Sequence, residues 1–538
     1  QPAATAVPAI VGKMGGVAPA HAFVAPNQKE MPHMNGIVTV SHSAGLYNSL
    51  TEINPEVDEF NVVRCDLCKT WSLADDGITY TFKLHEDAVW HDGEAVTAED
   101  VVLSLELINE PTRLVGYDVL KEYAAGRRHD RNVLFLYYDS SKIIDDHTVQ
   151  VKTKQPTPAF IQALSWDYFP MYPEHLLKQG KLPTYGNTSA LIGSGPFKLK
   201  KYEKDILSET ERNPNYFKDN RPYLDGIVHH VIKDKQRVLA AYKTRQVLFP
   251  DSVVNRLSPR DNLEIEKQLA GQATIHWTKG YPAAWGIVMN SEKSPFDNPN
   301  VRKAVNLAMH RQPIVHTMGG INPIGTPLPH DFPWSYTLDE ALKMPGFRED
   351  SPMVKSAVDI AEAKRLTVEA GAGPGTKVSL MGSTSAELCD LAQLLKQQFT
   401  DVLGWDISID QVETKVGSER RKSGDYQWSM ASGGVLNYDP DGAAIFYRKG
   451  TGRYFTESNH VDADLERVWA GITTETDLTK RKALVLEASN LLLDRGALHL
   501  VYYQVFAWIV DNSIQNFHLP PAFLTHMKHE HLWCDPAC

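Results

Sequence analysis

The sequence predicts an α/β fold divided into two or three domains. Segments that alternate like a strand and segments with helical periodicity follow one another along most of the chain, as in βαβ units. The chain has 538 residues, whereas a single hydrophobic core stops growing at about 250–300 residues. Its composition, 42% hydrophobic and 22% charged, is that of an ordinary globular protein. Disorder and coiled coil are therefore excluded.

The first clear unit is a strand followed by a capped helix. Residues 78–84 (ITYTFKL) alternate β-branched or aromatic residues with polar ones. After a turn at 91–93, Thr97 is expected to cap a helix that has Asp100 at its third position. The inner face of this helix is expected to carry Val101, Val102, Leu105 and Ile108.

The second half of the chain continues the alternation. A helix is expected to begin at Asn298, where a side-chain acceptor precedes Pro299. No repeat with a period of 20 to 50 residues is visible, which excludes solenoids and propellers. The further elements are expected as a helix over 360–370 ending at Gly371, a strand over 378–380, a helix over 388–402 ending at Gly404, a strand over 405–409, a helix over 484–492 stopping at Gly496 and a strand over 498–503.

Charge and hydropathy exclude two classes of partner. The net charge of −11 and the lack of a basic run exclude a nucleic-acid partner. No stretch approaches the roughly 20 consecutive apolar residues of a membrane span. Residues 1–30 lack both the basic start and the apolar centre of a signal peptide, so we expect a secreted chain that has already been processed.

Enzyme motifs are missing from the sequence. HExxH, GxSxG, GxxxxGK[ST] and EF-hand patterns are absent. The glycine cluster 371–375 follows a helix and precedes a strand, the reverse of the order in a dinucleotide-binding loop, and is expected to be a turn. We therefore expect neither a catalytic residue nor a cofactor.

Four of the five cysteines form two close pairs, Cys65 with Cys68 and Cys534 with Cys538. This spacing indicates an oxidising compartment and either two local disulfides or a tie between the chain ends. A redox-active or metal-binding CDLC motif stays an alternative, although the strand-then-helix setting that lowers a thiol pKa is missing. Cys389 lies in an apolar helical stripe and is expected to be a buried free thiol.

The segment 525–534 holds three histidines and a cysteine. These residue types would bind a transition metal if the segment curled to bring them together. A packed or solvated tail is the simpler interpretation, so no metal site is predicted. The acidic pairs Asp75–Asp76 and Asp145–Asp146 are expected in turns.

Several segments resemble one known family. Residues 77–84 together with 89–101 (VWHDGEAVTAEDV) resemble closely the signature of the family 5 extracellular solute-binding proteins. Segments 192–197 (IGSGPF), 212–217 (RNPNYF) and 296–318 are similar to further parts of that family, in the expected order. Its members are receptors of ABC importers for oligopeptides, dipeptides, nickel chelates and some oligosaccharides.

The resemblance implies a two-lobed periplasmic binding protein fold with an extra inserted domain and a two-segment hinge. The hinge is expected near 281–290 and 503–511. Closure of such lobes buries a ligand between them. The expected division is lobe I over 1–46, 190–284 and 506–538, an inserted subdomain of lobe I over 47–189, and lobe II over 285–505.

The loop 432–442 (SGGVLNYDPDG) is the central ligand-binding candidate, because glycines let the backbone approach a ligand. In the peptide-binding relatives an aspartate of this loop pairs with the peptide's α-ammonium group; the matching place here holds Leu436, and a neighbouring tryptophan is replaced by Gly433. An ammonium group buried without a charge partner costs several kcal/mol. An ordinary free-amine peptide is therefore disfavoured, unless Asp439 or Asp441 takes over the role.

The other candidates are aromatic or polar side chains near the implied cleft, where rings stack on sugar or apolar surfaces. The predicted ligand-binding residues are Tyr47, Asn48, Trp166, Tyr168, Trp285, Asn290, Trp428, Asn437, Tyr438 and Asp439.

The sequence therefore predicts a receptor that captures an oligosaccharide, an opine-like solute or a peptide. It is expected in the periplasm, as a monomer that is peripheral to the membrane and hands its ligand to an ABC transporter permease. A carrier of a metal or metal chelate and a hydrolase of a similar solute are the alternatives.

Overall fold

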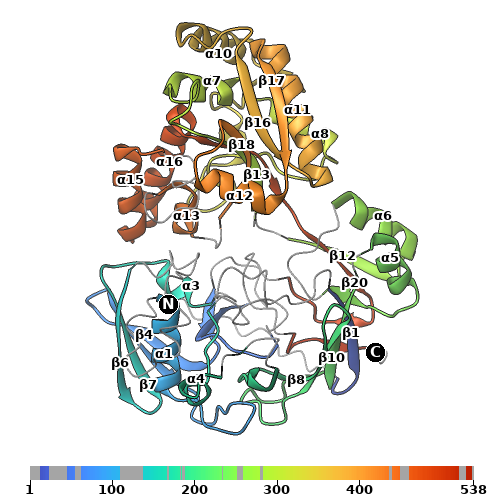
Figure 1. Cartoon of the computed structure of the whole chain (residues 1–538). Helices are drawn as coiled ribbons and strands as arrows, with labels where there is room; N and C mark the ends of the chain where they lie inside the picture. The colour runs from blue at the N-terminus through green and yellow to red at the C-terminus, as the bar shows by residue number, and fades with distance from the viewer. Residues whose placement is uncertain are drawn as a thin grey trace.

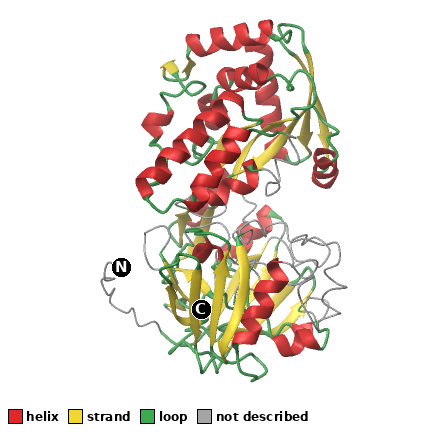
Figure 2. Ribbon diagram, turned by 90° about the vertical axis from the view of Figure 1, so that its left-hand side faces the viewer, coloured by secondary structure: helices red, strands yellow, loops and turns green. Residues whose placement is uncertain are grey.

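The computed structural model of the chain shows two lobes, one above the other in Figure 1 and again in the turned view of Figure 2. Strands and helices alternate in both lobes, so the predicted α/β class is confirmed. Within the residues described, no helix has the length and hydropathy needed to cross a bilayer. The structure describes residues 13–22, 45–54, 62–109, 137–165, 169–181, 183, 188–232, 234–250, 259–278, 283–435, 439–448, 460–519 and 529–535.

Lobe I, the lower lobe of Figure 1, is built on a five-stranded sheet in the order β11-β1-β10-β9-β8. β1 runs parallel to β10, with Val17 opposite Gly226, so the start of the chain and a much later segment form one sheet. Its strands are β1 (Val17–Ala22), β8 (Phe197–Glu203), β9 (Leu207–Arg212), β10 (Gly226–Val231) and β11 (Phe249–Pro250). Lobe I also contains α5 (Lys235–Lys243), α6 (Pro259–Leu269), and the short pair β21 (Ile514–Gln515) and β22 (Trp533–Cys534).

The inserted subdomain carries a four-stranded antiparallel sheet in the order β4-β5-β7-β6. Strand β5 confirms the strand predicted over 78–84, and Asp100 accepts a 2.7 Å hydrogen bond from the backbone N–H of Thr97 at the start of the predicted helix. The sheet comprises β4 (Cys68–Leu73), β5 (Thr79–Leu84), β6 (Tyr138–Asp145) and β7 (Thr148–Thr153). The other elements are β2 (Thr51–Ile53), β3 (Val63–Cys65), α1 (Ala98–Asn109), α3 (Phe160–Ala163), α4 (Glu174–Lys178) and η4 (Thr188–Ala190).

Lobe II is built on the mixed sheet β17-β16-β18-β13-β19. One face packs against α7, α10 and α11, and the other against α15 and α16. Its strands are β13 (Ala283–Met289), β16 (Lys377–Ser383), β17 (Asp406–Val412), β18 (Trp428–Gly433), β19 (Leu498–Gln504) and the hairpin β14 (Glu349–Ser351) with β15 (Val354–Lys355). Its helices are α7 (Pro299–Ala308), α8 (Arg311–Thr317), α9 (Leu338–Ala341), α10 (Ala357–Glu369), α11 (Ala386–Leu403), α12 (Thr414–Lys422), η5 (Pro440–Ala443), α13 (Ala444–Tyr447), α15 (Ala463–Thr474) and α16 (Leu478–Arg495).

Local sequence signals placed the ends of the lobe II helices correctly. The side chain of Asn298 caps α7 by accepting a 2.9 Å hydrogen bond from the N–H of Asn300. Gly404 follows α11 in the left-handed conformation, with φ of 71°, which costs glycine little. Gly496 follows α16 as predicted.

Two antiparallel strand pairs join the lobes. In lobe I, β12 (Ala273–Trp277) pairs with β20 (Ala507–Asp511), and in lobe II, β13 pairs with β19. Between the pairs, the N–H of Thr278 donates to the carbonyl of Phe506 over 2.9 Å. The first passage between the lobes therefore lies between β12 and β13, and the second lies over 504–507, between β19 and β20. The predicted two-segment hinge is confirmed, but β13 and β20 belong to the sheets on either side of it.

The signature segments of the sequence interlock inside lobe I. The imidazole of His91 accepts a 3.1 Å hydrogen bond from the N–H of Gly193 and lies 3.1 Å from the carbonyl of Gly195. A Cβ atom on Gly193 would lie 1.7 Å from the carbonyl oxygen of Leu46, so the two backbones touch where that glycine stands. Burial lowers the pKa of His91 to about 4, which keeps the imidazole neutral at physiological pH. These motifs therefore build the framework of lobe I.

The substitution Gly193→Ala is expected to lower the free energy of unfolding of lobe I by about 3 kcal/mol, because the backbone of Leu46 has no room to give way. Urea unfolding followed by circular dichroism measures the change. Gly382→Ala is the matched control, since the nearest atoms to its Cβ would be side-chain atoms of Ile409, Ala392 and Gln411 at 3.4, 3.8 and 3.9 Å. Equal stability of the two variants would contradict the proposed role of the close approach.

Candidate functional site

The inserted subdomain and lobe II pack directly on one another. One hydrophobic cluster contains Tyr138 and Phe160 of the subdomain together with Tyr447 and Trp469 of lobe II. At the same contact the hydroxyl of Tyr137 donates to Thr473 Oγ1 over 3.3 Å. The structure is therefore that of a closed pair of lobes.

The described part of the central loop is fixed within lobe II. Asp439 caps η5 by accepting a 2.9 Å hydrogen bond from the N–H of Asp441. The guanidinium of Arg481, from α16, donates to both carboxylate oxygens of Asp439 over 2.6 and 2.7 Å. Both side chains are buried, and a buried charge is tolerated when it is paired in this bidentate way.

Asp439, which the sequence predicts to bind the ligand, is engaged within lobe II. Its carboxylate is already neutralised by Arg481 and bonded to backbone, so it is not available to a ligand ammonium group. Burial alone would lower the pKa of Arg481, but Asp439 raises it. The pair fixes the loop to α16.

Asp441 is the second acid of this loop and lies completely inside lobe II. Its carboxylate accepts a 2.8 Å hydrogen bond from the hydroxyl of Thr473. Burial, followed by repulsion from Asp439, raises the pKa of Asp441 to about 6. Arg481 and Arg448 act in the opposite direction.

Three of the predicted ligand-binding residues, Tyr47, Trp285 and Trp428, retain a buried polar group without a hydrogen-bond partner among the described residues. Within the described part of the chain, the Tyr47 hydroxyl and the Trp285 indole N–H are unpaired. Tyr47 is fully buried and packs edge-on against Tyr172. Trp285 is half-buried at the start of β13, next to the crossing between the lobes. Tyr47 and Trp285 stay predicted ligand-binding residues.

Asn48 and Asn290, two further predicted ligand-binding residues, make hydrogen bonds within the protein framework. The Asn48 amide donates to Asp66 over 2.8 Å and accepts from Ser194 over 3.1 Å. The Asn290 amide donates to the carbonyls of Gly424 and Tyr426, each over 3.1 Å. Their hydrogen-bonding groups are thus engaged within their own lobes.

Trp428, a further predicted ligand-binding residue, lies in the core of lobe II. It is fully buried in lobe II, where its ring contacts Phe296, Phe399 and Trp405 at centroid distances of 5.7, 5.0 and 6.3 Å. The predicted residues Trp166, Tyr168, Asn437 and Tyr438 lie outside the described residues.

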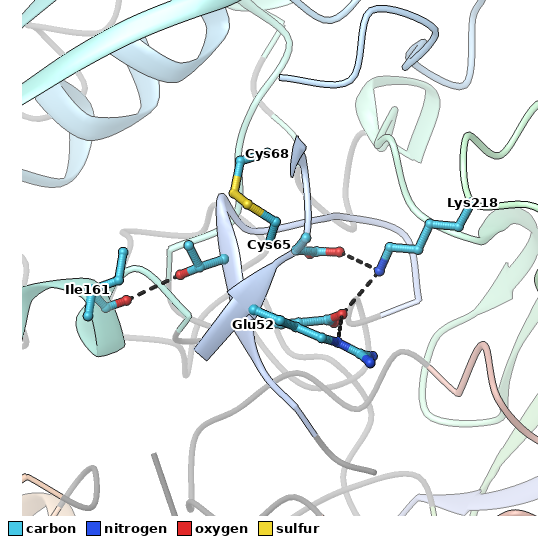
Figure 3. Close-up of a disulfide and its surroundings, with 8 residues drawn as sticks. Glu52, Cys65, Cys68, Ile161 and Lys218 are labelled. Carbon is cyan, nitrogen blue, oxygen red and sulfur yellow. Dashed lines mark hydrogen bonds and ion pairs between the residues drawn. A yellow bond between two sulfur atoms is a disulfide. The ribbon is translucent and has the colours of Figure 1, made fainter. Parts of the chain in front are cut away.

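A buried charge network lies beside the first cysteine pair (Figure 3). Lys218 reaches Glu52, Asp66 and Glu530 over 3.2, 2.9 and 3.0 Å. Burial alone would lower the pKa of Lys218, but these carboxylates raise it well above its usual value. Asp66 lies between Cys65 and Cys68 in the sequence, so the loop closed by the disulfide positions one carboxylate of the network.

The cysteines follow the predicted disulfide chemistry. Cys65 and Cys68 form a local disulfide, and Cys534 is also disulfide-bonded. Cys538 lies outside the described residues. Cys389 is free as predicted, but it is partly exposed, because its end of α11 lies at the margin of the sheet.

The described histidines of the C-terminal run do not form a metal site. Arg64 and Arg221 lie 3.2 and 3.4 Å from the two ring nitrogens of His531, and the ring of His529 packs edge-on against Phe249. Across the described ranges, no group of three or more histidine, cysteine, aspartate or glutamate side chains is arranged to hold a metal ion.

Sequence reasoning did not identify Tyr137, Arg448, Thr473 or Arg481. Each acts through a partner that is distant in the chain, such as Tyr137 and Thr473, which are separated by 336 positions. No local motif signals such a contact.

Comparisons with known proteins agree with this architecture. The sequence model described as bacterial extracellular solute-binding proteins, family 5 Middle, matches residues 63–455. The oligopeptide-binding protein OppA of Bacillus subtilis (strain 168) is 23% identical over 508 residues, which are 90% of this chain and 88% of that protein.

Two solved structures show the likeness in fold. DppA from Helicobacter pylori in complex with the peptide STSA has a TM-score of 0.76 at 17% identity, covering 97% of this chain and 99% of that one. AgaA from A. tumefaciens R10 in complex with agropinic acid has a TM-score of 0.74 at 19% identity, with the same coverage. The predicted two-lobed periplasmic binding protein fold is confirmed.

The substitution Asp439→Asn is expected to lower the free energy of unfolding by about 3 kcal/mol, because it leaves the Arg481 guanidinium buried without a counter-charge. Chemical unfolding monitored by tryptophan fluorescence measures the change. Asp425→Asn is the control, because its ion pair with Arg420 is exposed and worth less than about 1 kcal/mol. Unchanged stability of Asp439→Asn would reopen its role in ligand binding.

The substitution Asp441→Asn is expected to change how stability depends on pH. A carboxyl group whose pKa rises from 3.8 to about 6 on folding contributes stability that is complete below pH 3.8 and is lost as the pH rises through 6. Between pH 4.5 and 7.5, the free energy of unfolding of the asparagine variant therefore rises by roughly 2 kcal/mol relative to that of the native protein.

Unfolding at both pH values checks this expectation. Asp76→Asn is the control. Hydrogen bonding to Ile78 lowers the pKa of Asp76, so its effect on how stability depends on pH is confined to pH values below 3.8. If the stability difference between Asp441→Asn and the native protein is the same at both pH values, the raised pKa of the buried Asp441 carboxyl is contradicted.

Proposed function

Because the chain belongs to the bacterial extracellular solute-binding proteins of family 5, we propose that it is the receptor of an ABC importer. It holds a small polar organic solute between its two lobes and hands it to the transporter permease. The observation that carries this proposal is the pair of strands that cross between the lobes, since they let two rigid bodies rotate about one line.

The proposed division of the chain follows the sheets. Lobe I comprises 1–46, 190–284 and 506–538, its inserted subdomain 47–189, and lobe II 285–505. Pairing of β1 with β10 supports the discontinuous lobe I. Pairing of β12 with β20 and of β13 with β19 supports boundaries near 284 and 505.

The ligand chemistry is proposed from what the loop offers. Asp439 is paired with Arg481, and Asp441 is buried and bonded to Thr473, so neither acid is free to receive an ammonium group. Among the described candidates, the Tyr47 hydroxyl and the Trp285 indole N–H are neutral donors. Neutral donors and rings suit a sugar, an opine-like solute or a peptide held without its ammonium group.

Two of the similar solved structures hold ligands of the two kinds considered, a peptide and an opine-like solute. The DppA structure holds a peptide and the AgaA structure holds agropinic acid. Because the ammonium partner is missing, we favour a solute of the second kind. The agropinic acid complex makes an opine-like compound the first to test.

The proposed receptor binds its solute without chemical turnover. It acts in the periplasm as a monomer that is peripheral to the membrane. The two alternatives have little support: the described histidines are engaged by arginine and phenylalanine, and the acids that a hydrolase would use are paired within lobe II.

Native mass spectrometry of the protein as isolated, followed by release and identification of the bound molecule, tests the proposal. We expect a polar solute without a primary ammonium group, recovered unchanged after prolonged incubation. A free-amine peptide would contradict the proposed ligand chemistry, and a cleaved solute would favour the hydrolase.

Two tryptophan variants provide matched controls in the same measurement. Trp285→Phe and Trp508→Phe each remove one buried indole N–H. Trp285 lies beside the crossing, whereas Trp508 lies in the core of lobe I. We expect ligand occupancy to fall in the first variant and to be retained in the second.

A further inference from the structure

A tyrosine at the edge of the inserted subdomain connects it to lobe II by hydrogen bonds. Tyr137 immediately precedes β6, and its carbonyl accepts a 2.7 Å hydrogen bond from the N–H of Lys154. The next residue, Tyr138, is fully buried and donates to Glu106 over 2.7 Å. The subdomain sheet therefore presents the Tyr137 side chain from a fixed backbone.

Four side chains form one continuous chain of hydrogen bonds at this contact. The guanidinium of Arg448 donates to the Tyr137 hydroxyl. That hydroxyl donates to Thr473 Oγ1 over 3.3 Å, and the Thr473 hydroxyl donates to the Asp441 carboxylate over 2.8 Å. The Tyr137 hydroxyl accepts one bond and donates one. The Thr473 hydroxyl accepts from Tyr137 and has two acceptors within reach, the Asp441 carboxylate and, at 3.1 Å, the carbonyl of Trp469.

This chain of hydrogen bonds joins the positively charged Arg448 to the negatively charged Asp441 through two hydroxyl groups. Hydrogen bonds that end on ionised groups are stronger than neutral ones, and linked bonds polarise one another. Burial, followed by the negative charge of Asp441, raises the pKa of the Tyr137 hydroxyl. Tyr137 therefore keeps its proton at physiological pH and stays a donor to Thr473.

Only Tyr137 comes from the inserted subdomain, whereas Arg448, Thr473 and Asp441 all belong to lobe II. The lobe II members are held independently: Arg448 lies 3.5 Å from Glu466, and Thr473 is bonded to Asp441 within its own lobe. Opening the lobes would withdraw Tyr137 and leave the rest of the chain in place. The linkage is complete only when the lobes are closed.

We propose that Tyr137 is a latch between the lobes, whose hydroxyl, inserted between Arg448 and Thr473, stabilises the closed state. This proposal rests on the proposed function, in which the lobes open and close. Tyr137 is a positioning residue: it sets how long the lobes stay closed and touches no ligand. Loss of the Tyr137 hydroxyl removes hydrogen bonds of the closed state. It is expected to shift the equilibrium between closed and open lobes about three- to thirtyfold toward the open state.

Single-molecule fluorescence transfer between the lobes tests the latch without a ligand. Cysteines replacing Lys142 on β6 and Lys480 on α16, both exposed, carry the two dyes, and Cys389→Ser removes the free thiol. The protein is unfolded, dialysed and refolded to remove bound solute before measurement. We expect Tyr137→Phe to lower the ratio of closed to open molecules by about three- to thirtyfold.

Tyr80→Phe is the matched control, since the Tyr80 hydroxyl donates to Thr157 within the subdomain. It is expected to leave the closed fraction unchanged. Thr473→Val should reproduce the loss seen in Tyr137→Phe, and Thr473→Ser, which keeps the hydroxyl, should restore the closed fraction. In a double-mutant cycle, Tyr137→Phe should have little further effect on Thr473→Val.

A closed fraction that is the same in Tyr137→Phe and the native protein would overturn the latch. So would an equal loss in Tyr80→Phe, because that result would indicate general destabilisation. These outcomes are separate from the proposed function, because the measurement uses no solute. A chain that binds none of the expected solutes would still show the Tyr137-dependent shift.

Discussion

The structure depends on one constraint: in the described part of the chain, two segments pass between the lobes, on antiparallel strands that pair on both sides of the crossing. Because β12 pairs with β20 and β13 pairs with β19, each lobe is anchored by a strand pair that continues into the other. The backbone bond between Thr278 and Phe506 holds the two segments together at the crossing. Such a connection lets the two lobes rotate relative to each other about one line and resists sliding of one lobe past the other.

Rigid lobes are the second requirement, and the sequence motifs provide them. In lobe I, His91, Gly193 and Gly195 lock two backbone segments against each other. In lobe II, the pair formed by Asp439 and Arg481 ties the central loop to α16. These contacts fix backbone segments within each lobe, through a neutral imidazole in lobe I and an ion pair in lobe II.

Local signals in the sequence were sufficient for the elements but not for the site. Asn298 and Gly404 mark helix ends because a cap or a left-handed residue acts within one turn. Asp439 looked available because its partner, Arg481, lies 42 positions later and no pattern links them. Trp428 was indistinguishable from a ligand-stacking ring, since both uses require the same residue type. Tertiary contacts decide these roles.

Closure of the lobes over a solute is the central claim, and small-angle X-ray scattering tests it most directly. The radius of gyration is compared between the protein as isolated and the same protein stripped of solute by unfolding and refolding. The account predicts a larger and more heterogeneous particle after stripping, which returns to the compact form when the released solute is added back. Identical scattering in all three samples would contradict it.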